Sequence, residues 1–438
     1  MRETPGSPII SPKLQKIAEQ ARNYPEMMFN NLYHLIDQEL LLEAYQRTSK
    51  DSAAGVDKVT ARDYAEALYE NLHDLHDRLK SNRYVAQPVE RVWIEKEDGK
   101  QRPIGKPCFE DKIVQRAAVM ILAVLFEPLF QPFSHGFRKG HSQHQAIREL
   151  RERCMKLNIN WIVDADVSGY FDTIDHAKLR GFIEKKVKDG GILRLLGKWL
   201  KAGVLDRGKM VYPEKGTPQG GVASPMLANI FLHYVLDEWF VQDVQPRLKG
   251  RSFLIRFADD FIIGFEHEAD ARRVLEVLPK RFNRFNLTIH PEKTKLVRFS
   301  PPSVKVKTEK ENGTFDFLGF THYWAKSLQG YWIIKRKTIG KRLRRFMKAI
   351  YEWCRENLHE PVKEQHKTLC SKLRGYYQYY GIRGNYKMLE VVFEHTESAW
   401  RRWLGRRCSK GYVSGEEFSR FYRKVYPLPR PRIIHMNI

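Results

Sequence analysis

The sequence predicts an α+β fold in which a sheet that carries acidic side chains lies between two largely helical regions. Three observations favour it: strand-like apolar segments interrupted by aspartates, a glycine-rich turn followed by an apolar helix, and a basic, amphipathic C-terminal region. A chain of 438 residues, 42% of them hydrophobic, is long enough for two or three globular domains with sizeable cores.

The segment Ile255–Ile263 predicts a β-hairpin with two carboxylates at its turn. Asp259 and Asp260 stand between two apolar runs that contain β-branched residues, which is the pattern of strand, tight turn and strand. Such a turn can bring a carboxylate close to magnesium, which prefers oxygen ligands and keeps waters and substrate phosphates in its shell. An exposed Asp-Asp turn is the ordinary alternative, so a metal site needs support from other segments.

The segment Trp161–Asp172 supplies that support. Its first residues suit a buried strand, but Asp164 and Asp166 interrupt it and, being two positions apart, face the same side. A buried carboxylate needs a metal, a hydrogen bond or solvent, and an edge strand with solvated acids is the alternative. If the two segments are neighbouring strands, their carboxylates could hold two metals about 3.5–4 Å apart, the arrangement that supports in-line phosphoryl transfer.

A glycine-rich turn, Gly216–Ser224, precedes the apolar, helix-competent run Pro225–Ile230. Small residues there let a phosphate or a base approach the backbone. Most such turns are only turns, so this signal is weak by itself.

Composition indicates a nucleic-acid partner. The net charge is +24, and from Lys335 to Ile438 there are 25 Lys and Arg against 9 Glu and no Asp, a net +16 in a segment rich in Tyr and Trp. This combination suits a polyphosphate whose bases can stack, and a solvated basic helix face is the alternative for any single cluster. The five cysteines form no Cys-x-x-Cys pair, which argues against a zinc ribbon or a disulfide framework. Because no signal peptide or membrane span is recognisable, we expect a cytoplasmic protein with no membrane contact.

The order of several motifs resembles that of the group II intron reverse transcriptase/maturase family, from about Ala44 to Gly381. The motifs that carry this resemblance are Gly55–Asp57, Lys96–Gly105, Ser134–Arg138, Asp166–Asp172, Pro218–Gly220 with Ser224-Pro225, Phe257–Asp260, His290–Lys295, Phe317–Phe320 and Leu373–Tyr380. The family usually has Tyr at the position of Phe257. Many members also carry a C-terminal HNH nuclease with paired cysteines, which we expect this chain to lack.

The resemblance implies a right-hand polymerase with an antiparallel, ferredoxin-like palm sheet and an α-helical thumb, or maturase domain. We therefore expect an N-terminal extension over residues 1–30, fingers over 31–160, a palm over 161–325, a thumb over 326–395 and a basic tail over 396–438. Within these, Ile113–Leu122 reads as a buried helix, Val92–Ile104 as a hairpin and Phe182–Gly203 as helical.

The resemblance also assigns roles to individual residues. Asp166 and Asp259, with the Val167 carbonyl, would hold two magnesium ions, while Asp260 is the third catalytic carboxylate and Asp164 and Asp172 are structural. The residues expected to bind the incoming nucleotide are Lys96, Arg102, Phe171, Gln219, Gly220 and Lys293. Phe171 would exclude a 2′-hydroxyl, and either Lys293 or Lys295 would protonate the pyrophosphate. The residues expected to bind nucleic acid are Arg138, Arg342, Arg344, Arg345 and Tyr376.

The expected function is primer extension on an RNA template from dNTPs, together with binding of a structured intron RNA in splicing. The primer would be DNA or RNA. One alternative keeps the polymerase without splicing, as in host-adopted relatives used in CRISPR acquisition, phage defence or DNA repair. Another is a non-catalytic RNA-binding splicing factor, against which the intact Asp166, Asp259 and Asp260 argue.

Overall fold

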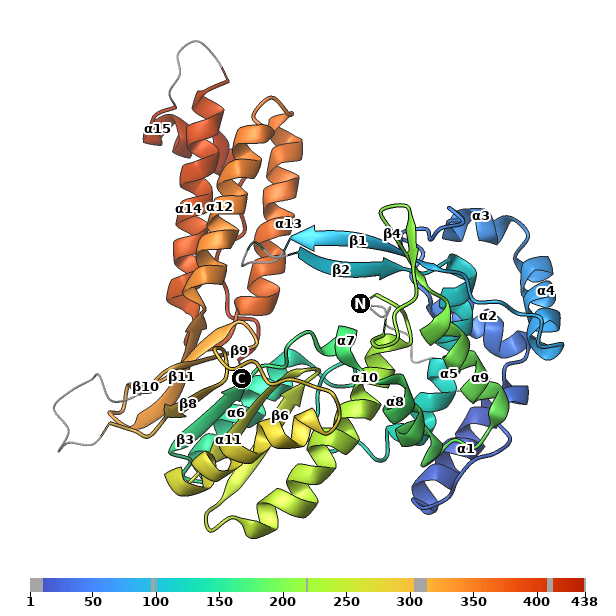
Figure 1. The fold of residues 1–438 in the computed structure, drawn as a ribbon. Coiled ribbons are helices and arrows are strands. Elements are labelled where there is room, and N and C mark those ends of the chain that lie inside the picture. Colours follow the sequence, from blue (N-terminus) through green and yellow to red (C-terminus); the bar gives the residue numbers. More distant parts are fainter. Residues whose placement is uncertain are drawn as a thin grey trace.

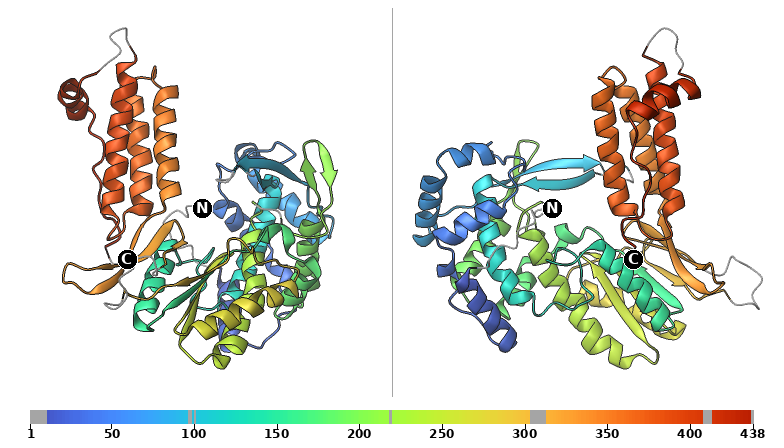
Figure 2. Two further views of the ribbon diagram at one scale, coloured as in Figure 1. Left: turned by 60° about the vertical axis from the view of Figure 1, so that its left-hand side comes forward. Right: turned by 180° about the vertical axis from the view of Figure 1, so that it is seen from behind.

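The structure, a computed structural model, describes residues 11–95, 99, 101–217, 220–302, 313–407 and 413–436. It has three parts: an N-terminal helical region with a small sheet, a central four-stranded sheet with its helices, and a C-terminal helix bundle (Figure 1). The expected mixture of helices and sheet is confirmed. The bundle and the β1–β2 hairpin both rise above the central sheet (Figures 1 and 2).

The N-terminal region is built on the buried helix α5. Its helices are α1 (Pro12–Asn23), η1 (Tyr33–Leu35), α2 (Gln38–Arg47), α3 (Ala61–Glu66), α4 (Leu68–Lys80), α5 (Phe109–Phe126) and α6 (Gln143–Lys156). Side-chain caps fix where they begin, as at Asp37 before α2 and in the Thr60/Asp63 capping box of α3. The buried helix expected at Ile113–Leu122 is confirmed within α5.

The small sheet of the N-terminal region has the strand order β2-β1-β4-β5. Strands β1 (Val89–Glu95) and β2 (Gln101–Lys106) form the expected hairpin, and the short strands β4 (Val204–Asp206) and β5 (Lys209–Val211) extend it. Residues on both sides of the expected boundary at 160 therefore share one sheet. The main hydrophobic core likewise runs from Leu14 to Ile289 without a break at that boundary.

The central sheet is antiparallel throughout, with the order β6-β7-β3-β8. Its strands are β3 (Trp161–Ala165), β6 (Ser252–Phe257), β7 (Asp260–Phe265) and β8 (Lys295–Arg298). Helix α11 (Glu268–Asn283) packs on β3 and β7, and α6 packs on β6. Because β3 is an interior strand, the alternative of an edge strand with solvated acids is wrong.

The helices between β3 and β6 correct one expectation. They are α7 (Tyr170–Thr173), α8 (His176–Glu184), α9 (Gly190–Lys201), α10 (Ser224–Leu232), η2 (His233–Asp237), η3 (Phe240–Val244) and η4 (Gln245–Arg247). Phe182–Gly203 is not one helix, because Asp189 caps a new one: its carboxylate accepts from Gly191 N and Ile192 N, and also from Leu32 N and Tyr33 N.

The C-terminal part begins with the sheet β11-β10-β9, formed by β9 (Phe315–Phe317), β10 (Phe320–Lys326) and β11 (Trp332–Thr338). The bundle consists of α12 (Gly340–Glu356), α13 (Val362–Tyr380) and α14 (Tyr386–Gly405), followed by α15 (Gly415–Glu417), η6 (Phe418–Tyr422) and α16 (Arg423–Val425). The expected boundary at 395 falls inside α14. Phe418 and Leu428 also belong to the core of the bundle, so the basic tail packs as part of it. None of the helices that the structure describes is long and apolar enough to cross a membrane.

Candidate active site

The β6–β7 hairpin places Asp259 at a two-residue turn. Phe257 pairs with Asp260, so only Ala258 and Asp259 lie between the paired positions. Ala258 has a φ of +58°, a left-handed conformation that is uncommon for a residue with a Cβ. Asp259 and Asp260 are both half-buried. The hairpin predicted from the sequence is confirmed.

Asp166 follows directly on β3, next to this hairpin. Strand β3 pairs with β7, which confirms that the two acidic segments are neighbouring strands. On the other side of β3, the Asp166 carbonyl accepts from His290 N at 2.8 Å, and Val167 bridges to Ile289. Its carboxylate, 41% exposed, lies 3.0 Å from the Nζ of Lys293. The backbone of the segment 289–294 thus holds Asp166 at the sheet end, beside the Asp259 turn.

Burial and neighbouring carboxylates raise the pKa of three aspartates at this site. Burial, and then the charge of Asp166, raises the pKa of Asp259, while nearby Arg102 opposes the shift. Burial, with the charges of Asp164, Asp259 and Asp166, raises the pKa of Asp260 to about 8. Burial and the charge of Asp316 raise the pKa of Asp164 to about 7. A cation bound here would relieve this repulsion and favour the ionised forms.

The donor set fits magnesium only if other ligands complete it. Among the residues that the structure describes, no three His, Cys, Asp or Glu side chains form a group able to hold a metal ion. Asp166 and Asp259 offer two hard carboxylate ligands that influence each other electrostatically, and magnesium typically takes one or two carboxylates plus waters and substrate phosphates. The site is therefore suited to a metal that arrives with, or is completed by, a phosphorylated substrate.

The glycine-rich turn packs between two elements at this site. Thr217 N donates to the Phe171 carbonyl at 2.7 Å, and a Cβ on Gly216 would lie 2.9 Å from the backbone of Asp172 in α7. On the β2 side, a Cβ on Gly220 would lie 2.3 Å from the Gly105 carbonyl oxygen. The glycines are thus required by close backbone approach, and the turn joins the small sheet to α7.

Comparison with known proteins decides the family. Residues 94–322 match the family model of reverse transcriptase (RNA-dependent DNA polymerase). The group II intron-encoded protein LtrA of Lactococcus lactis subsp. cremoris is 37% identical over 234 residues, covering 52% of this chain and 38% of LtrA. Protein YkfC of Escherichia coli strain K12 is 35% identical over 289 residues, covering 58% of this chain and 75% of YkfC.

The chain belongs to the group II intron-encoded reverse transcriptase family. A further relative, the mitochondrial nuclear intron maturase 1 of Arabidopsis thaliana, is 33% identical over 129 residues, covering 28% of this chain and 18% of that protein. The chain thus spans about two fifths of the length of LtrA and less of the plant maturase.

Two of the residues expected to bind the nucleotide lie near the Asp166–Asp259 pair. Arg102 of β2 acts electrostatically on Asp259, and Lys293 contacts Asp166. Phe171, 8% exposed, stands beside the glycine-rich turn, with its ring against that of Tyr170. Lys96 and Gln219 lie outside the described residues. Of the two candidate lysines, Lys293 contacts Asp166, whereas Lys295 lies opposite Asp164 in the pairing of β8 with β3.

Two residues expected to contact nucleic acid are largely enclosed by the protein. The Arg138 guanidinium is 7% exposed and is held by Glu127 and by the carbonyls of Gln131 and Ser134. Tyr376 is 5% exposed in the bundle core, with its ring against Phe346. Both side chains pack within the fold, and their contact with a nucleic acid stays a prediction.

The three arginines of α12 are placed differently from one another. Arg344 and Arg345 are exposed, whereas Arg342 is half-buried and reaches the base of the bundle. Its Nη1 would lie 2.9 Å from a Cβ on Gly319, and its charge partly opposes the rise in the pKa of Asp260. Arg342 therefore links the bundle to the acidic site.

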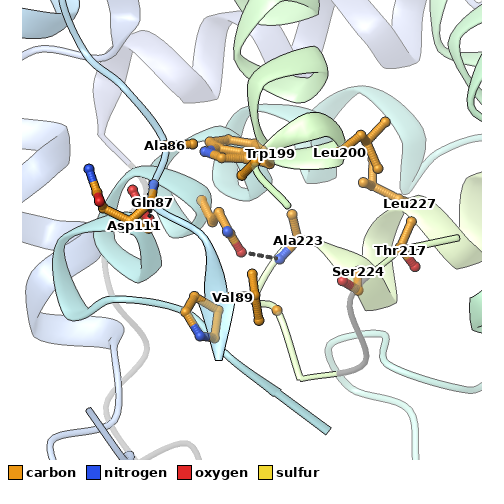
Figure 3. A pocket seen from close by; sticks show the side chains of 14 residues that line it. Ala86, Gln87, Val89, Asp111, Trp199, Leu200, Thr217, Ala223, Ser224 and Leu227 are labelled. Atoms are coloured by element: carbon orange, nitrogen blue, oxygen red, sulfur yellow. Dashed lines mark hydrogen bonds between the residues drawn. The ribbon is translucent and has the colours of Figure 1, made fainter. Parts of the chain in front are cut away.

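Sequence reasoning missed a network beneath the turn. Arg256 is fully buried in β6, where its guanidinium pairs with buried Asp237. The signal was present, since a single arginine interrupts the apolar run Phe253–Phe257 and buried charges are rare unless paired. Sequence reasoning also missed a pocket next to the glycine-rich turn. Asp111 of α5, Trp199 of α9 and Thr217 are among the residues that line it (Figure 3). None of its lining residues is one of the three catalytic candidates.

Proposed function

We propose that this chain is an RNA-directed DNA polymerase that extends a primer 3′-hydroxyl on an RNA template, and that it also binds a structured intron RNA as a splicing maturase. The juxtaposition of Asp166 and Asp259 at adjoining strand ends carries the proposal. The N-terminal region would be the fingers, the central sheet the palm and the bundle the thumb.

Asp166 and Asp259, with the Val167 carbonyl, would hold two Mg²⁺ ions. When bound, the metals lower the pKa of the primer hydroxyl and steady the leaving pyrophosphate. Asp260, the first residue of β7, would support the site from the position next to Asp259. A cation bound at the pair would favour the ionised forms of Asp260 and Asp164, and their negative charge would then help to hold it.

The protein's own cations would handle the triphosphate. Arg102 stands within electrostatic reach of Asp259, so it would neutralise phosphate charge that develops near the metals. Once a divalent metal ion is bound to the Asp166 carboxylate, Lys293 would be free to move away from it and protonate the pyrophosphate. Lys96, which lies outside the described residues, is a further candidate for triphosphate binding.

The surface around the nucleotide would be formed by Phe171 and the glycine-rich turn. The Phe171 ring would lie under the sugar and exclude a 2′-hydroxyl, which favours deoxynucleotides. Gly220 brings backbone close to β2, so the turn would offer main-chain groups to the nucleotide and the template, together with Gln219.

The basic bundle supports RNA binding. Arg344 and Arg345 are exposed on α12, near the half-buried Arg342, and a cationic helix face suits phosphate contacts that position a nucleic acid without reading its sequence. These arginines would contact the phosphates of the primer–template near the palm and those of a folded intron RNA farther from it.

The direct test is primer extension by the purified chain on a DNA-primed RNA template with dNTPs and Mg²⁺. We expect extension that stops on chelation of the metal. If no extension occurs while the chain binds RNA tightly, the non-catalytic splicing factor is the better description. Splicing of the intron RNA that surrounds the gene, with and without the protein, separates a maturase from a host-adopted polymerase.

A further inference from the structure

A buried ion pair lies directly beneath the Asp259 turn. The Nε and Nη2 of Arg256 donate to Oδ1 and Oδ2 of Asp237 at 2.8 and 2.5 Å, and both side chains are 0% exposed. Asp237 is the last residue of the π-helical segment η2, and its carboxylate meets Arg256 of strand β6. The pair therefore ties the helix that follows the glycine-rich turn to the catalytic hairpin.

The remaining guanidinium nitrogen reaches the turn itself. The Arg256 Nη1 donates to the carbonyl oxygen of Ala258 and to Oδ1 of Asn229, each at 3.0 Å. Ala258 is the residue with a φ of +58° and immediately precedes Asp259. A non-glycine residue in that conformation persists only where its surroundings hold it. The Arg256 side chain stabilises this conformation by its hydrogen bond to the Ala258 carbonyl, which belongs to the peptide bond between Ala258 and Asp259.

A second chain segment braces the turn from outside the sheet. His135 N donates to the Arg256 carbonyl at 2.8 Å, and Arg256 N donates to the Phe133 carbonyl at 3.0 Å. Gly136 follows, and a Cβ there would lie 2.1 Å from the Ala258 nitrogen. The Asn229 side-chain amide donates to the Gly136 carbonyl at 2.7 Å, which closes the network.

We propose that Arg256 is a positioning residue that sets the Asp259 turn for metal binding, and that Gly136 is required so that the segment 133–136 can clamp this turn. The inference rests on the proposed function, in which Asp259 is a metal ligand. Arg256 touches neither substrate nor metal. It acts by fixing the peptide from which the Asp259 side chain projects.

The competing explanation is an ion pair that only stabilises the fold. Removing one partner of a buried pair is strongly destabilising, whereas replacing both partners by apolar residues of similar volume is often neutral. The double variant Arg256→Met/Asp237→Leu therefore removes the hydrogen bond to Ala258 without leaving an unpaired charge. Arg256→Lys keeps the charge but cannot form the same set of bonds. Gly136→Ala pushes on the turn while leaving the ion pair untouched.

Two readouts separate positioning from stability. Thermal unfolding reports whether each variant folds, and Mn²⁺ titration followed by electron paramagnetic resonance, without nucleic acid, reports metal affinity directly. Single-turnover primer extension over a range of Mg²⁺ concentrations adds the catalytic effect. The matched control is Arg251→Met, which removes a half-exposed arginine, ion-paired with Glu266, just before the same strand.

We expect the double variant, Arg256→Lys and Gly136→Ala to weaken Mn²⁺ affinity by about 10- to 100-fold, the usual effect of losing a partner that orients a metal ligand. Their affinity for a primer–template should stay near the parental value, and Arg251→Met should match the parent throughout. Parental Mn²⁺ affinity in a folded double variant would overturn the role of Arg256. If the double variant does not fold, parental affinity in both Arg256→Lys and Gly136→Ala overturns the proposal. A parent that binds Mn²⁺ at Asp259 but extends no primer would contradict the proposed function and leave the positioning role supported.

Discussion

The Nζ of Lys293 lies 3.0 Å from Oδ2 of Asp166, whereas Lys295, two residues later, pairs across the sheet with Asp164. Both partners of the Lys293–Asp166 pair are substantially exposed, so the contact adds little stability. In the proposed mechanism the contact matters by position, because it would put an ammonium group beside the metal-bound triphosphate.

Lys293→Met is therefore expected to slow the single-turnover rate of nucleotide addition by about 100-fold, the lower range for loss of a general acid. Lys295→Met, a matched change on the same segment, should leave the rate near the parental value. Rapid-quench measurement at saturating dNTP and Mg²⁺ makes the comparison. A larger loss in Lys295→Met would transfer the role to that lysine.

Asp259→Asn removes a carboxylate from the turn while changing little of the surface. We expect primer extension to fall to background, since a neutral amide is a weak ligand for a hard divalent cation. Affinity for primer–template should change little. Extension assays and binding titrations check this, with Asp243→Asn, a change to a half-exposed aspartate paired with Arg247, as the control. Robust synthesis by Asp259→Asn would remove Asp259 from the catalytic set.

Phe171→Val opens space beside the glycine-rich turn. We expect the ratio of ribonucleotide to deoxynucleotide incorporation to rise by about tenfold or more, because a steric barrier to the 2′-hydroxyl is lost. The ratio of kcat/KM for the matched rNTP and dNTP measures it. Phe182→Val, which trims a ring in α8 that packs on Phe231 and Tyr234, is the control. Unchanged selectivity in Phe171→Val would mean that Phe171 only fills the core.

Neutralising Arg342, Arg344 and Arg345 to Gln should weaken RNA binding and flatten its salt dependence. Each lost phosphate contact reduces the slope of log K against log salt by about 0.7–0.9. Binding to a folded RNA should suffer more than extension of a saturating primer–template. The charge-matched control changes Arg272, Arg273 and Lys280, all exposed on α11, to Gln. Equal effects from the two triple variants would show a general charge effect and no α12 docking surface.

We expect Asp111 to make the free energy of unfolding depend on pH. Burial raises its pKa to about 6, although Tyr84 and the Gln87 backbone donate hydrogen bonds to the carboxylate. The folded state therefore binds a proton on Asp111 more tightly than the unfolded state does. The contribution of Asp111 to the free energy of unfolding is most favourable below about pH 4 and is lost as pH rises through about 6. Across that window the change approaches about 3 kcal/mol.

Asp111→Asn should abolish that dependence. Denaturant unfolding of parent and variant at steps from pH 4 to pH 7 gives the difference in unfolding free energy. We expect the parent to lose stability relative to the variant as pH rises. A difference that stays constant with pH would mean that Asp111 does not change its protonation over this range.

The sequence by itself determined the features whose information is local. The Asp259–Asp260 hairpin, the strand that ends at Asp166, the buried helix α5 and the β1–β2 hairpin all follow from apolar periodicity and turn residues within single segments. The family followed from the order of such segments. Short-range physics fixes these elements because strand alternation, helix periodicity and tight turns depend on neighbours a few residues apart.

Only the tertiary structure decided which side chains share a site. Asp189 divides the helical stretch after Phe182, and its carboxylate also binds the backbone near Leu32. Arg138, which was expected to contact nucleic acid, donates to Glu127 and to two carbonyls. Arg256 reaches Ala258 only because Asp237 and Asn229, distant in sequence, surround it. A charged side chain adopts whichever partner the fold brings within hydrogen-bond distance, and burial magnifies the cost of having none. That partner is set by long-range packing, which no local pattern encodes.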